Sequence, residues 1–139
     1  MKKVLTMGEI MLRLSTPNYQ KIEQAQCFDA VYGGGEANVA VSLAKFGLKS
    51  SFATKLPNNS LGKRAEQYLN QFGVNTNDVI HGEERLGIYF LEKGYSIRPS
   101  MVTYDRKYSA FSMSYADEFD FEKIFADADW FHFLGLNLL

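Results

Sequence analysis

Residues 31–38, Val-Tyr-Gly-Gly-Gly-Glu-Ala-Asn, lead three consecutive glycines into a helical pattern in which Val39, Leu43 and Phe46 stand at i, i+4 and i+7. Glycines at this point free backbone N–H groups and let a ligand approach the main chain closely. The start of the helix adds a partial positive potential, and the Asn38 amide can both donate and accept hydrogen bonds. The stretch predicts a strand-to-helix junction that can bind a small polar ligand. For the glycine triplet alone, a plain turn without a ligand is the simpler interpretation.

Strand and helix patterns alternate on both sides of this junction. Before it, strands are predicted over 4–7, 10–14 and 27–32, with a loop over 15–24. After it come a strand over 50–56, a turn over 57–60, a helix over 61–72 and a short strand over 79–81. Strands over 86–92 and 101–106, a helix over 121–128 and an apolar strand over 130–134 complete the pattern. Because the alternation at both ends encloses an all-strand insertion, we predict an α/β fold with a mostly parallel sheet and a small β subdomain.

The composition is that of an ordinary soluble globular protein, with 46% hydrophobic and 22% charged residues among 139. The net charge of −1 predicts neither nucleic acid nor a membrane surface as a partner. The single cysteine, Cys27, cannot form an internal disulfide, which favours a reducing, cytoplasmic location. Glu9 and Arg13 interrupt any signal-peptide core, and no apolar run approaches the roughly 20 residues of a membrane helix.

The last ten residues, 130–139, are densely apolar. Such a run is typical of an interior strand in a parallel sheet, covered on both faces. The covering elements would have to come from residues outside this sequence, so we expect the chain to be cut short in mid-fold. The alternative is a small natural domain with an apolar end.

Several common chemistries have no motif here. The glycine triplet lacks both the Gly-Lys-Ser/Thr ending of a phosphate loop and the spaced third glycine of a dinucleotide fingerprint. There is no paired-histidine zinc motif and no second cysteine, so no metal site is predicted in this chain. Arg85, Lys93 and Arg98 are interpreted as solvated charge.

Three landmarks together resemble the ribokinase-like (PfkB) carbohydrate kinases: Gly8-Glu9, the Gly33–Asn38 segment, and Ser60-Leu-Gly-Lys-Arg-Ala65 at the start of the second helix. Their spacing matches, and the resemblance covers essentially all of the chain. Within that family it is most similar to the 2-keto-3-deoxygluconate kinases, whose aromatic-Arg-Lys segment corresponds to Thr103-Tyr-Asp-Arg-Lys107. One departure is Pro57, where the family usually has glycine.

The resemblance implies a ribokinase-like α/β fold, a three-layer sheet with a small β-strand lid, of which the C-terminal half is missing. Residues 1–139 would form the N-terminal part of one sugar kinase domain, with no second domain. The lid strands would lie near 10–14, 27–32 and 86–106. In relatives such strands pair between subunits, so a homo-oligomer through the lid is expected.

The resemblance also implies a substrate site for a sugar acid. A carboxylate at Glu9 would accept hydrogen bonds from sugar hydroxyls, and Asn38 would bind another. Tyr89 and Tyr104 would close over the sugar, and the Arg106 guanidinium would bind its carboxylate. The full set of expected substrate-binding residues is Glu9, Gly33, Gly34, Gly35, Asn38, Tyr89, Tyr104, Arg106 and Leu136.

Each of these residues also has a structural interpretation. The two tyrosines could be cross-strand packing residues, Arg106 a cation that protects an edge strand, and Glu9 part of a bulge. The resemblance favours the site for Glu9, Gly34, Asn38 and Arg106.

The implied reaction transfers the γ-phosphoryl group of ATP to a sugar hydroxyl with Mg²⁺ assisting. Its base would be an Asp in a Gly-Ala-Gly-Asp segment, which this sequence lacks; Asp127 and Asp129 have no such glycines beside them. We therefore predict no catalytic residue in this chain and no activity from it alone. The alternatives are a kinase for a neutral sugar, such as fructose or ribose, and a non-enzymatic sugar-binding module.

Overall fold

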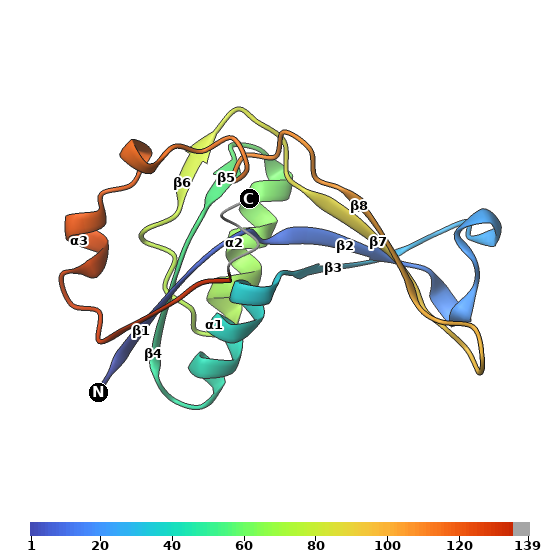
Figure 1. Cartoon of the computed structure of the whole chain (residues 1–139), viewed down its shortest axis with the longest axis horizontal. Coiled ribbons are helices and arrows are strands. Elements are labelled where there is room, and N and C mark those ends of the chain that lie inside the picture. The colour runs from blue at the N-terminus through green and yellow to red at the C-terminus, as the bar shows by residue number, and fades with distance from the viewer. Residues whose placement is uncertain (135–139) are drawn as a thin grey trace.

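The computed structural model describes residues 1–134, and a parallel three-stranded sheet forms its body. The strands are β1 (Lys3–Met7), β4 (Lys49–Ala53) and β9 (Trp130–His132), in the order β4-β1-β9 (Figure 1). Parallel neighbours require crossover connections, which α1 (Gly35–Lys45) and α2 (Ser60–Gln71) help to supply. The predicted α/β architecture is therefore present.

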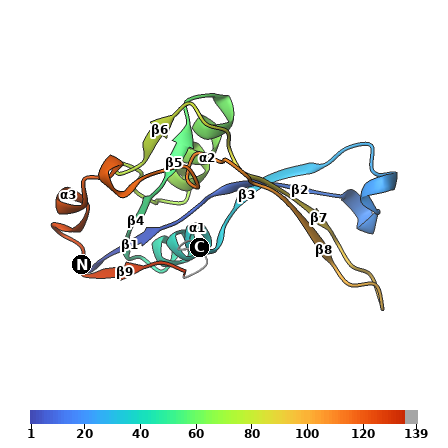
Figure 2. The same ribbon diagram turned by 45° about the horizontal axis from the view of Figure 1, so that its top comes forward.

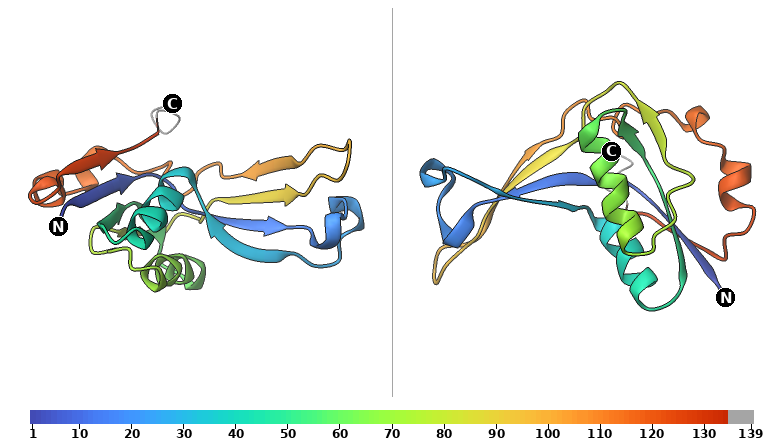
Figure 3. Two further views of the ribbon diagram at one scale, coloured as in Figure 1. Left: turned by 90° about the horizontal axis from the view of Figure 1, so that it is seen from below. Right: turned by 180° about the vertical axis from the view of Figure 1, so that it is seen from behind.

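The two helices cover one side of this sheet (Figure 3). They bury a core in which Phe52, Leu56 and Leu69 are at most 1% exposed. Ala65 and Leu69, four residues apart on α2, are buried and form the apolar stripe by which the helix packs here. Its first turn is capped by Asn59, whose Oδ1 accepts hydrogen bonds from the backbone N–H groups of Leu61 and Gly62 at 3.1 Å each.

A third layer covers the opposite side of the sheet. It contains the short helices η3 (Ala116–Glu118) and α3 (Phe121–Phe125), with α3 at the end of the body remote from the lid (Figure 1). Leu5 and Ala53 point to this side and pack with Phe119 and Ile124. The helix predicted over 121–128 is shorter: it starts where expected, after the capping residue Asp120, and ends at Phe125.

The lid is a separate four-stranded sheet that projects from the body as a twisted arm (Figures 1 and 2). Its strands are β2 (Met11–Ser15), β3 (Asp29–Gly33), β7 (Ile88–Glu92) and β8 (Met101–Asp105), in the order β3-β2-β7-β8. The central pair is parallel and the two outer pairs are antiparallel. The strands of this sheet lie within two residues of the ranges predicted for lid strands.

The tip of the lid is more ordered than a loop. Two 3₁₀ turns, η1 (Pro17–Tyr19) and η2 (Ile22–Gln24), occupy the predicted loop over 15–24. The Tyr19 and Tyr95 rings lie 5.3 Å apart, and the Arg98 guanidinium donates to the Tyr19 carbonyl. Arg98 therefore joins η1 to the turn between β7 and β8. The interpretation of this residue as solvated charge was wrong, because its guanidinium hydrogen-bonds the backbone there.

The predicted strand over 50–56 is two strands. β4 ends at Ala53, and β5 (Lys55–Pro57) turns away to pair in parallel with β6 (Ile80–Gly82). Pro57 was predicted to start a turn but ends β5 instead. It needs no N–H there, because the next bond to the partner strand comes from Asn58, whose N–H donates to the Gly82 carbonyl at 2.8 Å.

β9 lies at the edge of the sheet that residues 1–134 form. Its Trp130 and Phe131 side chains are exposed. The prediction that this strand is interior requires a neighbour beyond those residues and stays a prediction. Among residues 1–134, no helix is long and apolar enough to cross a membrane.

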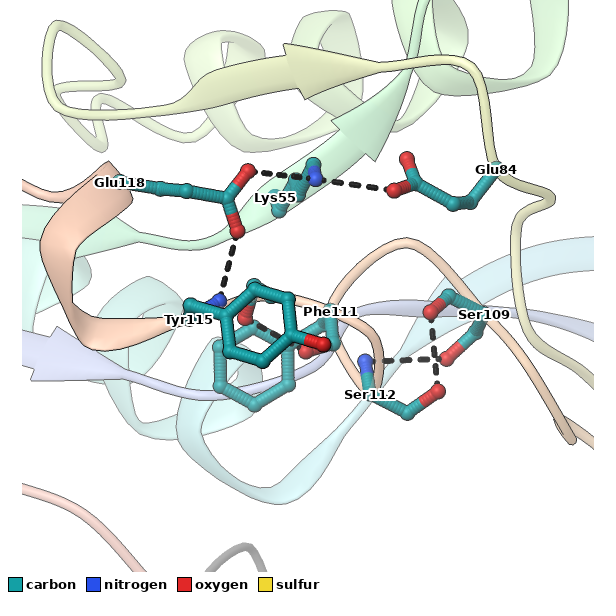
Figure 4. Close-up of polar contacts among 8 residues, drawn as sticks. Lys55, Glu84, Ser109, Phe111, Ser112, Tyr115 and Glu118 are labelled. Carbon is teal, nitrogen blue, oxygen red and sulfur yellow. Dashed lines mark hydrogen bonds and ion pairs between the residues drawn. The ribbon is translucent and has the colours of Figure 1, made fainter.

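A buried lysine on β5 forms ion pairs with carboxylates from two other segments of the body (Figure 4). The Lys55 ammonium on β5 lies 2.7 Å from a Glu118 oxygen on η3 and 3.0 Å from a Glu84 oxygen after β6. These hydrogen bonds, first of all the one to Glu118, raise the pKa of Lys55, against the opposing effect of burial. We call Lys55, Glu84 and Glu118 the lysine clamp.

Candidate functional site

The connection between β1 and β2 places a buried carboxylate at the base of the lid. Glu9 is 4% exposed, and the Arg106 Nη2 group donates a short hydrogen bond to its Oε2. The other oxygen, Oε1, is buried and has no hydrogen-bond partner among residues 1–134. A buried carboxylate oxygen without a donor is costly, so this atom marks a position where a ligand hydroxyl would be favourable.

Gly87 keeps this carboxylate accessible. A Cβ at that position would lie 2.5 Å from Glu9 Oε1 and 3.3 Å from Arg106 Cβ. Sequence reasoning missed Gly87, although a glycine inside a strand pattern, here the one predicted over 86–92, often marks a close approach of a ligand or another backbone.

The glycine triplet lies against the same connection. Gly34 is the N-cap of α1, and a Cβ on it would overlap the Glu9 carbonyl oxygen. A Cβ on Gly33 would lie 3.0 Å from Tyr89 Oη and 3.8 Å from Asn38 Oδ1. The structure therefore brings Gly33, Gly34, Glu9, Asn38 and Tyr89 together.

Two tyrosines form one wall of the site. The Tyr89 and Tyr104 rings lie 5.9 Å apart with an interplanar angle of 38°. The Arg106 guanidinium lies 5.9 Å from the Tyr104 centroid, at the outer limit of a cation–π contact. The cross-strand packing interpretation is thus correct for this pair, and it is compatible with a role in the site.

An ion pair fixes the end of β8, one residue before Arg106. Arg85 Nη1 donates to Asp105 Oδ1 at 2.7 Å and Nη2 donates to the Asp105 carbonyl at 3.0 Å. The Arg85 guanidinium lowers the pKa of the Asp105 carboxyl. Arg85 is exposed, in keeping with its interpretation as solvated charge, and it also pairs with the residue that precedes Arg106.

Gly35 differs from the other two glycines of the triplet. A Cβ on it would overlap Leu134 Cδ1, and the Leu134 N–H donates to Glu36 Oε1 at 3.2 Å. Gly35 therefore allows the end of β9 to pack on α1. Leu136, the other expected contact from this end of the chain, lies outside the described residues.

A further side chain on this face was not assigned a role from the sequence. Arg13 lies opposite Tyr89 in the pairing of β2 with β7. The signal was available, because Arg13 is the one charged residue in the alternating strand Met-Leu-Arg-Leu-Ser.

The described part of the chain offers no set of side chains that could bind the Mg²⁺ implied by the family resemblance. Residues 1–134 contain no group of three or more His, Cys, Asp or Glu side chains that could hold a metal ion. We therefore assign no described residue to Mg²⁺ or ATP.

Comparisons with known proteins agree with the architecture. The family model of the pfkB family carbohydrate kinases matches residues 1–139. The 2-dehydro-3-deoxygalactonokinase of Haloferax volcanii is 34% identical over 135 residues, 97% of this chain and 42% of that protein.

Solved structures show the same fold. The 2-dehydro-3-deoxygluconokinase of Thermotoga maritima is 54% identical with a TM-score of 0.96, over 98% of this chain and 42% of that one. An Escherichia coli protein described as a Ribokinase II is 21% identical with a TM-score of 0.89, over 100% of this chain and 45% of that one, a likeness of fold alone. The ribokinase-like fold is confirmed, and the chain spans less than half the length of these relatives.

Proposed function

Since the chain belongs to the pfkB family of carbohydrate kinases, we propose that it supplies the sugar-binding half of an ATP-dependent kinase that converts 2-keto-3-deoxygluconate to its 6-phosphate. This sugar acid is the 2-dehydro-3-deoxygluconate in the name of the Thermotoga maritima relative. The observation that carries the proposal is the pairing of buried Glu9 with part-exposed Arg106: the Glu9 backbone adjoins Gly34 of the glycine–Asn38 junction, and the Arg106 guanidinium adjoins Tyr104 of the tyrosine wall.

In this proposal the sugar hydroxyls bind at the base of the lid. Glu9 Oε1 accepts one hydroxyl hydrogen bond, since it is buried and lacks a donor among residues 1–134. The exposed Asn38 amide binds a second hydroxyl. Overlap with the Glu9 carbonyl excludes a side chain at Gly34, so that the backbone there stays close to the ligand.

The sugar carboxylate would bind Arg106. A guanidinium carries five N–H donors, of which the ion pair with Glu9 uses one. The Arg106 side chain is 39% exposed, which leaves its other donors accessible to a ligand. Glu9 and Arg106 therefore bind different ends of the substrate while they orient each other.

ATP would supply the phosphoryl group, and positioning and charge stabilisation dominate such transfers. This chain contributes the position of the acceptor sugar. Its expected base, a glycine-flanked Asp, is absent from the sequence.

The test joins this chain to the part of the Thermotoga maritima enzyme that it does not cover. We expect the chimera to phosphorylate 2-keto-3-deoxygluconate, and the 139-residue chain alone to bind that acid without forming ADP. Fructose and ribose complete the panel. Binding by a chimera that is silent toward all three sugars would instead support a sugar-binding module, and turnover by the isolated chain would contradict the division of the site.

A neutral sugar is the second candidate, because Glu9 already neutralises the Arg106 charge. The Arg106→Ala substitution in the chimera separates the two. For an acidic substrate we expect kcat/KM to fall by about tenfold or more, the cost of losing a charge-assisted hydrogen bond. Turnover of fructose would change far less, and an equal loss for both sugars would contradict the role of Arg106.

A further inference from the structure

Arg13 lies in a row of side chains that crosses the lid beside the site. In the pairing of β2 with its two neighbours, Arg13 stands opposite Val31 of β3 and Tyr89 of β7. Tyr89 in turn stands opposite Tyr104 of β8. Residues opposite each other on adjacent strands project to the same face of a sheet. The Arg13 side chain is therefore on the face of the tyrosine wall, next to Tyr89.

The guanidinium of Arg13 has no polar partner among residues 1–134. Its Nε is buried without a hydrogen bond, and the side chain makes no ion pair there. Asp29, opposite Ser15, shares this face by register, and Glu9 Oε1 lies beside Gly87, two residues before Tyr89; neither carboxylate forms an ion pair with Arg13. Arg85, Arg98 and Arg106 all hold hydrogen bonds to protein groups.

A half-buried guanidinium without a partner is unfavourable, because its donors are partly removed from water without compensation. One interpretation is structural: the Arg13 stem packs along apolar neighbours and its charge remains in water. The buried Nε argues against this, since the head group is then not fully solvated. The position instead suits an anion that approaches over Tyr89.

We propose that Arg13 is a specificity-determining residue that binds the carboxylate of an acidic sugar together with Arg106. This inference rests on the proposed function and extends it. Arg106 brings a charge that Glu9 already balances, whereas Arg13 forms no ion pair with a described carboxylate. Arg13 thus supplies the attraction for an acid that the Glu9–Arg106 pair alone does not.

Isothermal titration of the 139-residue chain tests this with 2-keto-3-deoxygluconate and fructose. Arg13→Gln is expected to weaken binding of the acid by about tenfold, the effect of one charge-assisted hydrogen bond, and binding of fructose by less than about twofold. Arg13→Lys keeps the charge and should retain most of the affinity. Arg64→Gln is the matched control, because Arg64 is an exposed arginine of α2 that faces the opposite side of the lid with Leu12 and Tyr32.

Three results would overturn the inference. Equal losses for acid and fructose, with a lowered unfolding temperature, would assign Arg13 a structural role. Unchanged acid binding in Arg13→Gln, with a loss in Arg106→Gln, would remove Arg13 and leave the proposed function intact. A parent chain that binds fructose but not the acid would refute the acidic substrate and the role of Arg13 together.

Discussion

At the scale of single residues, the glycine triplet contains two neighbouring positions with different constraints. A Cβ on Gly34 would overlap the backbone carbonyl of Glu9. This carbonyl can move only if the whole β1–β2 connection moves with it. The Gly33 Cβ position meets the hydroxyl of Tyr89, the end of a side chain that can turn away. The constraint at Gly34 therefore affects the stability of the fold, whereas the constraint at Gly33 affects the position of Tyr89 in the site.

Gly34→Ala should therefore lower the free energy of unfolding by about 1–3 kcal/mol, the usual cost of overpacking, and abolish sugar binding. Gly33→Ala should leave stability within about 1 kcal/mol of the parent and weaken sugar binding through the displaced Tyr89. Urea unfolding and titration with 2-keto-3-deoxygluconate measure both effects. Equal stability of the two variants would show that the Glu9 carbonyl does not limit the Gly34 position.

The sequence allowed most of these residues to be chosen, but not their contacts. The landmarks around Glu9, Asn38 and Arg106 could be recognised locally. The pairing of Glu9 with Arg106 could not, because 97 residues separate them and only the lid brings them together. The same applies to Arg13, whose significance depends on its register with Tyr89.

At the scale of elements, prediction succeeded where a segment carries its own periodicity. The stripe of α2 and the alternation of the lid strands are local patterns, and both elements lie where they were expected. The division of residues 50–57 into β4 and β5 was missed, because no glycine or other local break in this segment marks the change of partner from β1 to β6. Which strands pair with each other is decided by the tertiary structure and cannot be read from the local sequence pattern.

The lysine clamp is an element-level contact with a testable pH dependence. Lys55→Met should lower the free energy of unfolding at pH 7 by about 1–3 kcal/mol, because two carboxylates lose a buried cation that hydrogen-bonds both. Urea unfolding measures this, and Lys63→Met, an exposed lysine of α2, is the control. A similar loss in both variants would show that burial of Lys55 is unimportant.

The sign of the pH effect follows from the pKa shifts. The hydrogen bond from Lys55 lowers the pKa of Glu118. The pKa of Glu84 is lowered mainly by a backbone N–H and, to a smaller extent, by Lys55. Their contribution is present above the unfolded value of about 4.3 and is lost as pH falls through the lowered folded values. The pKa of Lys55 is raised, so its contribution is present below about 10.4 and is lost as pH rises through the folded value. The difference between parent and Lys55→Met should therefore shrink from pH 5 to 3; a constant difference would contradict the clamp.

At the scale of the whole molecule, the lid is a sheet whose two edges belong to β3 and β8. All five residues of β8 are exposed, including Met101 and Val102. An edge of this kind presents unpaired backbone groups that another strand can bind. Because Tyr104 also lies on β8, a partner at this edge would reach the wall of the sugar site.

We therefore expect a homodimer through the lid, the homo-oligomer that the family resemblance implies. Light scattering should give the mass of a dimer for the parent chain and a lower mass for Val102→Lys, because the added ammonium would have to be desolvated at the edge. Phe46→Lys is the matched control: Phe46 is an equally apolar, exposed residue at the end of α1, on the body and away from the lid. A monomeric parent would refute the dimer, and dissociation by both lysine substitutions would place the interface on the body.

Since the edge adjoins Tyr104, dimerisation and sugar affinity should also be coupled, so that Val102→Lys weakens sugar binding only at concentrations where the parent is a dimer.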